Sequence, residues 1–185
     1  ILELFAMCRI SGWKEPTVDF IPLFETIPDL EKAGDIMKDL FNNPIYQNHL
    51  KMRQNKQTVM LGFSDGTKDG GYFMAKWSIY KAKETLSKLA TEYKISMAFF
   101  DGRGGPPARG GGNTHEFYAS MGDTIQNDDI QLTIQGQTIS SNFGTLDSSQ
   151  FNLEQLLSSG ISNKILNPGK NNLSPEDRAT MQEMA

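Results

Sequence analysis

Cysteine and histidine are scarce in this sequence of 185 residues. Cys8 is the single cysteine, and His49 and His115 are the only histidines. One cysteine cannot form a disulfide within the chain, and there is no cluster of the Cys/His kind that binds zinc. We therefore expect a protein of the reducing cytoplasm. His49 is expected at the surface, and His115 is expected to cap or pack at the start of a helix.

The chain also lacks an excess of positive charge and a long apolar run. Its 18 basic and 22 acidic residues give a net charge of -4, so no overall attraction for nucleic acid or anionic membranes is expected. No apolar run approaches the roughly 18 residues of a membrane span. The apolar start, Ile1 to Met7, has no basic segment before it. We expect a fragment of a longer soluble protein, without a signal peptide.

Neither an internal repeat nor a domain-dividing linker is found, so residues 1–185 are expected to form one unit. A strand, a polar turn and a helix follow one another three times. The predicted strands are 18–24, 58–63 and 95–100, and the predicted helices are 28–41, 44–53, 72–93 and 113–121. The run 58–63 is apolar throughout, as is typical of parallel strands covered on both faces. The pattern predicts an α/β fold.

The later elements are expected to be shorter. Residues 130–134 alternate as a half-exposed strand, 135–137 resemble a turn into 138–139, and 151–157 suit a helix. A last helix is expected after Ser174, which is followed by proline and acidic residues. In the long helix 72–93, the lysines are expected to cover the face opposite the apolar stripe.

Three carboxylates follow the three predicted strands. Glu25, Asp65 and Asp101 are separated by 40 and 36 residues, intervals that suit βα units. In a parallel sheet, all three would emerge at the carboxyl edge, where α/β folds place their active sites. Two such oxygen ligands, here Glu25 and Asp65, suit Mg²⁺ or Mn²⁺. Spacing alone equally allows these residues to cap the following helices.

Two glycine-rich segments follow the second and third strands. Lys68 lies in the first, residues 62–71, where it either completes an anion site at a helix N-terminus or is a solvated surface lysine. Arg103 and Arg109 lie in the second, residues 101–112. Guanidinium groups bind carboxylate or phosphate bidentately, and glycines allow backbone amides to form an anion-binding nest. The spacing of nucleotide phosphate loops is absent.

In these segments the sequence resembles phosphoenolpyruvate carboxylases, from about residue 21 to residue 144. Residues 22–26, Pro-Leu-Phe-Glu-Thr, are similar to the family's metal-ligand strand. Residues 59–71 resemble the signature around the catalytic lysine, and 102–112 resemble the glycine-arginine loop. Gln135-Gly136 and Phe143-Gly144 also fit. The resemblance implies a fold that is part of a (β/α)₈ TIM-type barrel with flanking helices.

The resemblance also implies the roles of the candidate residues. Glu25 and Asp65 would hold Mg²⁺ or Mn²⁺, and Lys68 would be catalytic. Arg103 and Arg109 would bind substrate anions, with Asp101 among the catalytic residues. The substrate-binding glycines would be Gly102, Gly104, Gly105, Gly110 and Gly111. The implied parent is a lyase and a homo-oligomer, a tetramer in the family, that carboxylates phosphoenolpyruvate with bicarbonate to oxaloacetate and so feeds the tricarboxylic acid cycle.

The sequence departs from the family pattern at three positions. Phe63 replaces a common tyrosine, Gly66 a common serine, and Asp101 a histidine that usually faces the substrates. An ionised aspartate accepts hydrogen bonds but cannot donate them, so handling of bicarbonate is expected to differ. A further essential histidine of the family lies upstream and other substrate-binding groups lie downstream. We therefore expect the isolated chain to be inactive.

Two alternatives use the same residues. Arg103-Gly104-Gly105 and Arg109-Gly110-Gly111 are triplets of the RGG type found in RNA-binding tails, although here they lie between a strand and a helix. Another metal-dependent enzyme that acts on a phosphorylated or carboxylated small molecule would share the carboxylates and arginines. In each interpretation a partial barrel leaves open strand edges and uncovered faces.

Overall fold

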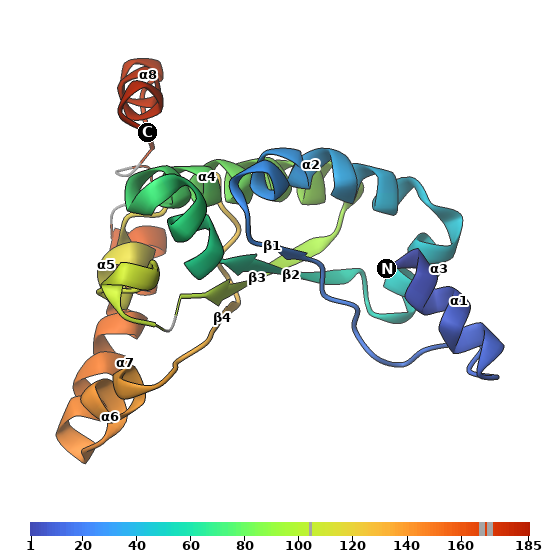
Figure 1. The fold of residues 1–185 in the computed structure, drawn as a ribbon, viewed down its shortest axis with the longest axis horizontal. Coiled ribbons are helices and arrows are strands. Elements are labelled where there is room, and N and C mark those ends of the chain that lie inside the picture. Colours follow the sequence, from blue (N-terminus) through green and yellow to red (C-terminus); the bar gives the residue numbers. More distant parts are fainter. Residues whose placement is uncertain (104, 167–168, 170–171) are drawn as a thin grey trace.

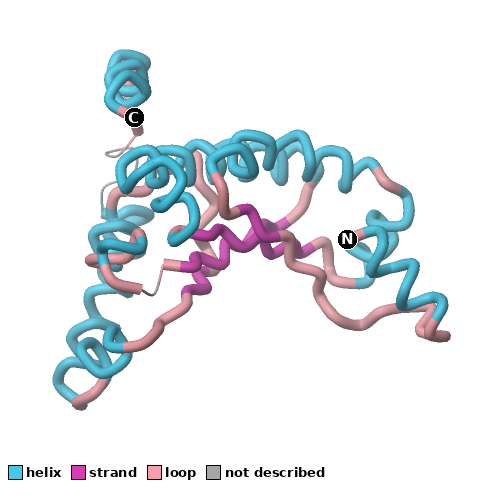
Figure 2. Tube along the Cα trace, viewed as in Figure 1, coloured by secondary structure: helices cyan, strands magenta, loops and turns pink. Residues whose placement is uncertain are grey.

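The computed structural model describes residues 1–103, 105–166, 169 and 172–185. Four strands form one sheet in the middle of the molecule, and in the view of Figures 1 and 2 helices lie above it and to its left and right. The strands are β1 (Leu23–Phe24), β2 (Lys56–Gly62), β3 (Ser96–Gly102) and β4 (Ile130–Leu132). The helices are α1 (Leu2–Ile10), α2 (Ile27–Asn42), α3 (Pro44–Met52), α4 (Ser64–Tyr93), α5 (Thr114–Ala119), α6 (Gln137–Phe143), α7 (Leu146–Ile161) and α8 (Pro175–Met184).

The sheet is parallel and its strands lie in chain order, β1-β2-β3-β4. Phe24 of β1 is opposite Leu61 of β2, and Leu61 is opposite Asp101 of β3. The three strand ends are therefore level with one another at the carboxyl edge. This confirms the predicted helix-rich α/β fold with parallel strands, and the open four-stranded sheet is consistent with part of a TIM-type barrel.

Helices α2 and α4 pack together over one face of the sheet (Figure 1). Leu30, Ala33, Met37 and Phe41 of α2 are buried there, and α4 and β2 contribute Ile79, Leu86, Val59 and Leu61 to the same core. Gly34 allows the two helices to approach closely, because a Cβ at this position would lie 2.7 Å from Cγ2 of Thr85. A capping box of Thr26 and Asp29 begins α2 directly after β1.

Several predicted elements have different bounds. The first strand is reduced to two residues: Pro22 has no N–H to donate, and Asp19 instead pairs with Arg53 at 2.6 Å. The predicted helix 72–93 is present, but residues 64–70 are also helical and not a turn, so that α4 begins at Ser64; Gly71, with φ 82°, separates the two helical segments. The turn predicted at 135–137 is shorter than expected, because α6 begins at Gln137 and includes residues 138–139.

Two surface predictions are also corrected. His49 is buried, because its ring packs edge-on against Phe5 at a centroid distance of 5.0 Å. Lys83 of α4 is buried in the interior of the protein, whereas the sequence pattern predicts that the lysines of this helix face the solvent. None of the helices in the described part of the chain is long and apolar enough to cross a membrane.

Candidate functional site

Glu25 and Asp65 are brought together at the carboxyl edge of the sheet. Glu25 directly follows β1, and Asp65 lies in the first turn of α4, directly beyond β2. The pKa of the Glu25 carboxyl is raised, first by desolvation and then by the negative charge of Asp65. Two carboxylates that repel each other at the end of a sheet are stabilised by a cation between them.

Gly62 makes the position of Glu25 possible. In the register of the sheet, the residue after Phe24 lies beside Gly62 at the end of β2. A Cβ built on Gly62 would lie 2.4 Å from Cβ of Glu25 and 3.3 Å from its Oε2. Any larger residue at position 62 would therefore have to displace the Glu25 side chain.

Lys68 lies at the same edge of the sheet, which we call the carboxylate rim, and pairs with Asp65. Its Nζ is 2.7 Å from Oδ1 of Asp65, and both side chains are substantially exposed. This contact lowers the pKa of Asp65, which keeps that carboxylate ionised. The ammonium group is thus at the edge of the carboxylate pair and remains accessible to a ligand from solution.

Arg103 follows β3 and is almost completely buried. Its Nη1 donates to Oγ1 of Thr114 at 3.0 Å, and its Cζ lies 4.4 Å from the centre of the Phe117 ring. Both partners belong to α5. Nε of Arg103 has no hydrogen-bond partner among the described residues, so the guanidinium group retains an unused donor.

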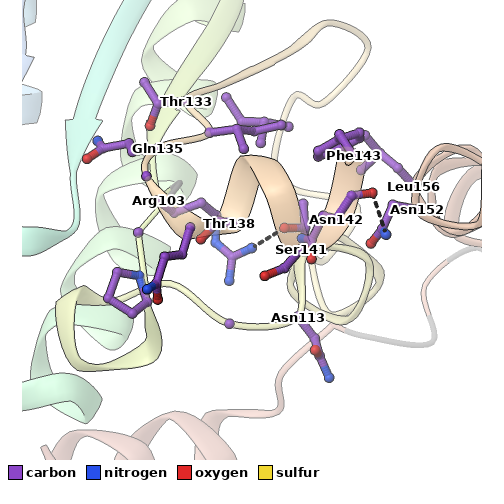
Figure 3. A pocket seen from close by; sticks show the side chains of 18 of the residues that line it. Arg103, Asn113, Thr133, Gln135, Thr138, Ser141, Asn142, Phe143, Asn152 and Leu156 are labelled. Atoms are coloured by element: carbon purple, nitrogen blue, oxygen red, sulfur yellow. Dashed lines mark hydrogen bonds between the residues drawn. The ribbon is translucent and has the colours of Figure 1, made fainter. Parts of the chain in front are cut away.

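A cavity of about 770 Å³ brings the two arginines together. Arg103 and Arg109 both line it, and α6 and α7 form the opposite wall (Figure 3). The polar residues Asn113, Ser141 and Asn142 line the same cavity. Arg109 is exposed, and its charge also contributes to lowering the pKa of Asp65. The arginine pocket is therefore next to the carboxylate rim.

The glycines of residues 101–112 allow the loop to pack tightly. Gly110 has φ +78°, and a Cβ there would lie 2.9 Å from the carbonyl oxygen of Phe63. A Cβ on Gly111 would lie 1.7 Å from the carbonyl oxygen of Gly105. Gly105 itself lines the arginine pocket, whereas Gly102 ends β3 beside Gly62. Gly104 lies outside the described residues.

Lys76 of α4 contacts the same loop through a hydrogen bond. Its Nζ donates to the carbonyl oxygen of Gly110 and lies 4.3 Å from the centre of the Phe63 ring. Burial, with the charge of Arg103 as the next contribution, lowers the pKa of Lys76 to about 7. The loop is therefore held to α4 by a group that sequence patterns do not single out.

Asp101 occupies a different position from the other carboxylates. Its side chain is buried between the sheet and α4, where Oδ2 accepts from Lys83 Nζ and from the Tyr118 hydroxyl, both at 2.7 Å. Side chains alternate along a strand, so Asp101 shares its direction with buried Phe99. Asp101 is not among the residues that line the arginine pocket.

The structure thus gathers Glu25, Asp65 and Lys68 on one rim, with Arg103 and Arg109 in the adjoining pocket. Among the described residues, no three His, Cys, Asp or Glu side chains form a group that could hold a metal ion. The candidate site thus consists of a pair of carboxylates, Glu25 and Asp65, each of which offers an oxygen ligand. This donor set fits Mg²⁺ or Mn²⁺, which complete their shells with water and substrate oxygens.

Sequence reasoning missed several residues that build the site. Thr114 and Phe117 hold Arg103, and Lys83 and Tyr118 hold Asp101. One signal was available for Lys83, which lies four residues after Ile79 and three before Leu86, within the buried stripe of α4. The hydrogen bonds from α5 to Arg103 and Asp101 span 11 and 17 residues, and no spacing rule predicts them.

Comparison with known proteins agrees with this geometry. The family model described as phosphoenolpyruvate carboxylase matches residues 1–185. A protein named phosphoenolpyruvate carboxylase from Corynebacterium efficiens is 39% identical over 168 residues, which cover 90% of this chain and 18% of that relative. The chain thus spans less than a fifth of the relative's length. Because the family model covers all 185 residues, the chain belongs to the phosphoenolpyruvate carboxylase family.

Proposed function

We propose that this chain forms the metal-binding and anion-binding part of the active site of a phosphoenolpyruvate carboxylase. The observation that carries the proposal is the meeting of Glu25, Asp65 and Lys68 beside the pocket that Arg103 and Arg109 line. Both substrates of this reaction are anions. Carboxylates that hold a divalent cation, together with a lysine and two arginines, are the groups such substrates require.

In the proposed reaction, bicarbonate attacks the phosphoryl group of phosphoenolpyruvate. The bond from phosphorus to the enol oxygen breaks, which gives carboxyphosphate and an enolate. Carbon dioxide leaves phosphate and bonds to C3 of the enolate, which yields oxaloacetate. When bound, Mg²⁺ or Mn²⁺ supplies Lewis acidity toward phosphoryl and enolate oxygens.

The protein's residues would orient and neutralise these anions. Arg103, which lines the pocket, would bind phosphate or carboxylate oxygens there, and Arg109 would do so from its exposed side. Lys68 would offer its ammonium group to charge that develops at the rim. The family resemblance assigns substrate binding to Gly102, Gly104, Gly105, Gly110 and Gly111, and we propose the same role for them here.

The proposal extends to the parent protein. We propose that residues 1–185 are part of a catalytic (β/α)₈ barrel domain of a cytoplasmic homo-oligomer, and that nucleic acid and membranes are not partners. Large apolar side chains of α7, such as Leu146 and Leu157, are exposed in this chain. Such a face is expected to pack against other parts of the parent.

The first prediction concerns the reaction itself. The full-length parent is expected to form oxaloacetate from phosphoenolpyruvate only when bicarbonate and Mg²⁺ or Mn²⁺ are both present, whereas the 185-residue chain alone is expected to form none. Oxaloacetate is measured by coupling to malate dehydrogenase and following NADH oxidation. Phosphate release by the parent that does not require bicarbonate would favour the other metal-dependent enzyme instead.

The second prediction tests the packing beneath Glu25. Gly62→Ala places a Cβ where Glu25 already lies, so the carboxylate of Glu25 is expected to move away from that of Asp65. The Mg²⁺ concentration for half-maximal activity of the parent is expected to rise about tenfold, the lower limit for changes that misorient a metal ligand. Gly160→Ala on α7 is the matched control, because a Cβ there meets no atom within 4 Å. An unchanged Mg²⁺ requirement in Gly62→Ala would contradict the prediction.

A further inference from the structure

Lys83 is a buried cation in the middle of a long helix. Its side chain is 2% exposed and that of Asp101 is 1% exposed, and their charged atoms are 2.7 Å apart. The ammonium group also lies 5.1 Å from the centres of the Phe99 and Phe117 rings. No other group in the described residues forms a salt bridge with Lys83, so Asp101 alone balances its charge there.

Such a pair is not explained by stability alone. Removing two charges from water is costly, and an apolar pair of similar volume often stabilises a core equally well. Burial lowers the pKa of Lys83, whereas Asp101 opposes that change. The role of the pair is therefore better sought in the groups that the carboxylate holds.

The carboxylate of Asp101 connects α4 to α5. Its Oδ2 accepts from both Lys83 and the hydroxyl of Tyr118, which is buried on α5. The same short helix contacts Arg103 at two points: Thr114 accepts from Nη1, and the Phe117 ring lies against the guanidinium. A chain of contacts therefore runs from Lys83 through Asp101 and Tyr118 to the side chain of Arg103.

We propose that Lys83 is a positioning residue for the anion site: it orients Asp101, which anchors α5 through Tyr118 and so fixes the guanidinium of Arg103. This inference rests on the proposed function. It assigns Asp101 an indirect role, in which its carboxylate supports the pocket and does not touch the substrates. The pair Lys83–Asp101 would then be the means by which this chain functions with an aspartate at position 101.

The test uses the full-length parent and three single variants. Lys83→Met removes the cation and retains most of the side-chain volume. Tyr118→Phe leaves the ion pair intact and removes the hydrogen bond from the Tyr118 hydroxyl to Asp101. Lys88→Met is the matched control, because Lys88 is an exposed lysine on the same helix. Thermal unfolding, kcat and KM for phosphoenolpyruvate are measured for each.

Lys83→Met and Tyr118→Phe are both expected to raise KM for phosphoenolpyruvate by about tenfold, the lower end of the loss of one hydrogen bond to a charged group. The kcat of Tyr118→Phe and its unfolding temperature are expected to stay close to those of the wild type. Lys88→Met is expected to match the wild type in every measurement.

A double variant, Lys83→Met combined with Asp101→Asn, provides a rescue. It removes both charges of the ion pair, and the amide oxygen introduced at position 101 can still accept a hydrogen bond from the Tyr118 hydroxyl. The KM for phosphoenolpyruvate is therefore expected to return toward that of the wild type.

A merely structural role would lower the unfolding temperature of Lys83→Met without changing KM in Tyr118→Phe. That result would overturn the inference, even if Lys83→Met proved too unstable to assay. A wild-type KM in folded Lys83→Met would also overturn it. A wild-type parent that forms no oxaloacetate would instead remove the proposed function, and the inference with it.

Discussion

Glu25→Gln in the full-length parent is expected to lower kcat/KM for phosphoenolpyruvate by about 10³-fold, since a bound metal contributes several kcal/mol of charge stabilisation in a transition state. Glutamine retains the size of the side chain and removes its charge. The substitution also leaves Asp65 paired only with Lys68. Excess Mg²⁺ is expected to restore part of the activity, because the remaining carboxylate still offers one ligand.

The control for this change is Glu31→Gln, which makes the same chemical substitution at an exposed position of α2. Its activity and Mg²⁺ requirement are expected to equal those of the wild type. Isothermal titration of Mg²⁺ into Glu25→Gln provides a second measurement, in which weaker binding is expected. Activity of Glu25→Gln within about threefold of the wild type would show that Glu25 is not a metal ligand, since the loss of a ligand costs far more.

The meeting of Glu25 and Asp65 could be predicted because it depends on local rules. Each residue lies just past an apolar run, and parallel strands in chain order place such residues at one edge. The bounds of α2 could be predicted in the same way, because Thr26 and Asp29 form a capping box at its start and Asn43-Pro44 ends its helical apolar pattern. Strong local signals thus predicted the sheet and its rim.

The position of Asp101 could not be predicted in the same way. Like Glu25, it lies at the end of a strand, but it is still within β3 and points toward α4. The direction of a side chain reverses with each residue of a strand, so an uncertainty of one residue in the strand end exchanges the two faces. The buried position of Lys83 escapes prediction for a related reason: its charge favours the solvent, whereas its place in the apolar stripe favours the core.

The pocket around Arg103 depends on contacts that no local pattern encodes. Residues of α5 hold the guanidinium, and α6 and α7 close the opposite wall. The sequence pattern predicts only a turn at 135–137 and does not predict helix α6, which begins at Gln137. The glycine-arginine loop could be recognised from composition, whereas the burial of Arg103 and the exposure of Arg109 required the folded structure.

This difference between the two arginines leads to the second large expected effect. Arg103→Lys keeps the positive charge and removes the planar fork that contacts Thr114 and lies on the Phe117 ring. We expect kcat/KM for phosphoenolpyruvate to fall by about 10²-fold, comparable to the loss of one preorganised donor in an active site. Steady-state kinetics of the parent, with the unfolding temperature measured in parallel, would test this.

Arg9→Lys provides the matched control, since Arg9 is exposed in the last turn of α1 and far from the pocket along the chain. It is expected to behave as the wild type. If Arg103 binds a substrate anion bidentately, a lysine with its single ammonium group cannot replace it, even though the net charge of the pocket is unchanged. Wild-type kinetics in a folded Arg103→Lys protein would show that charge alone is sufficient, and that the buried geometry of Arg103 is not used by the reaction.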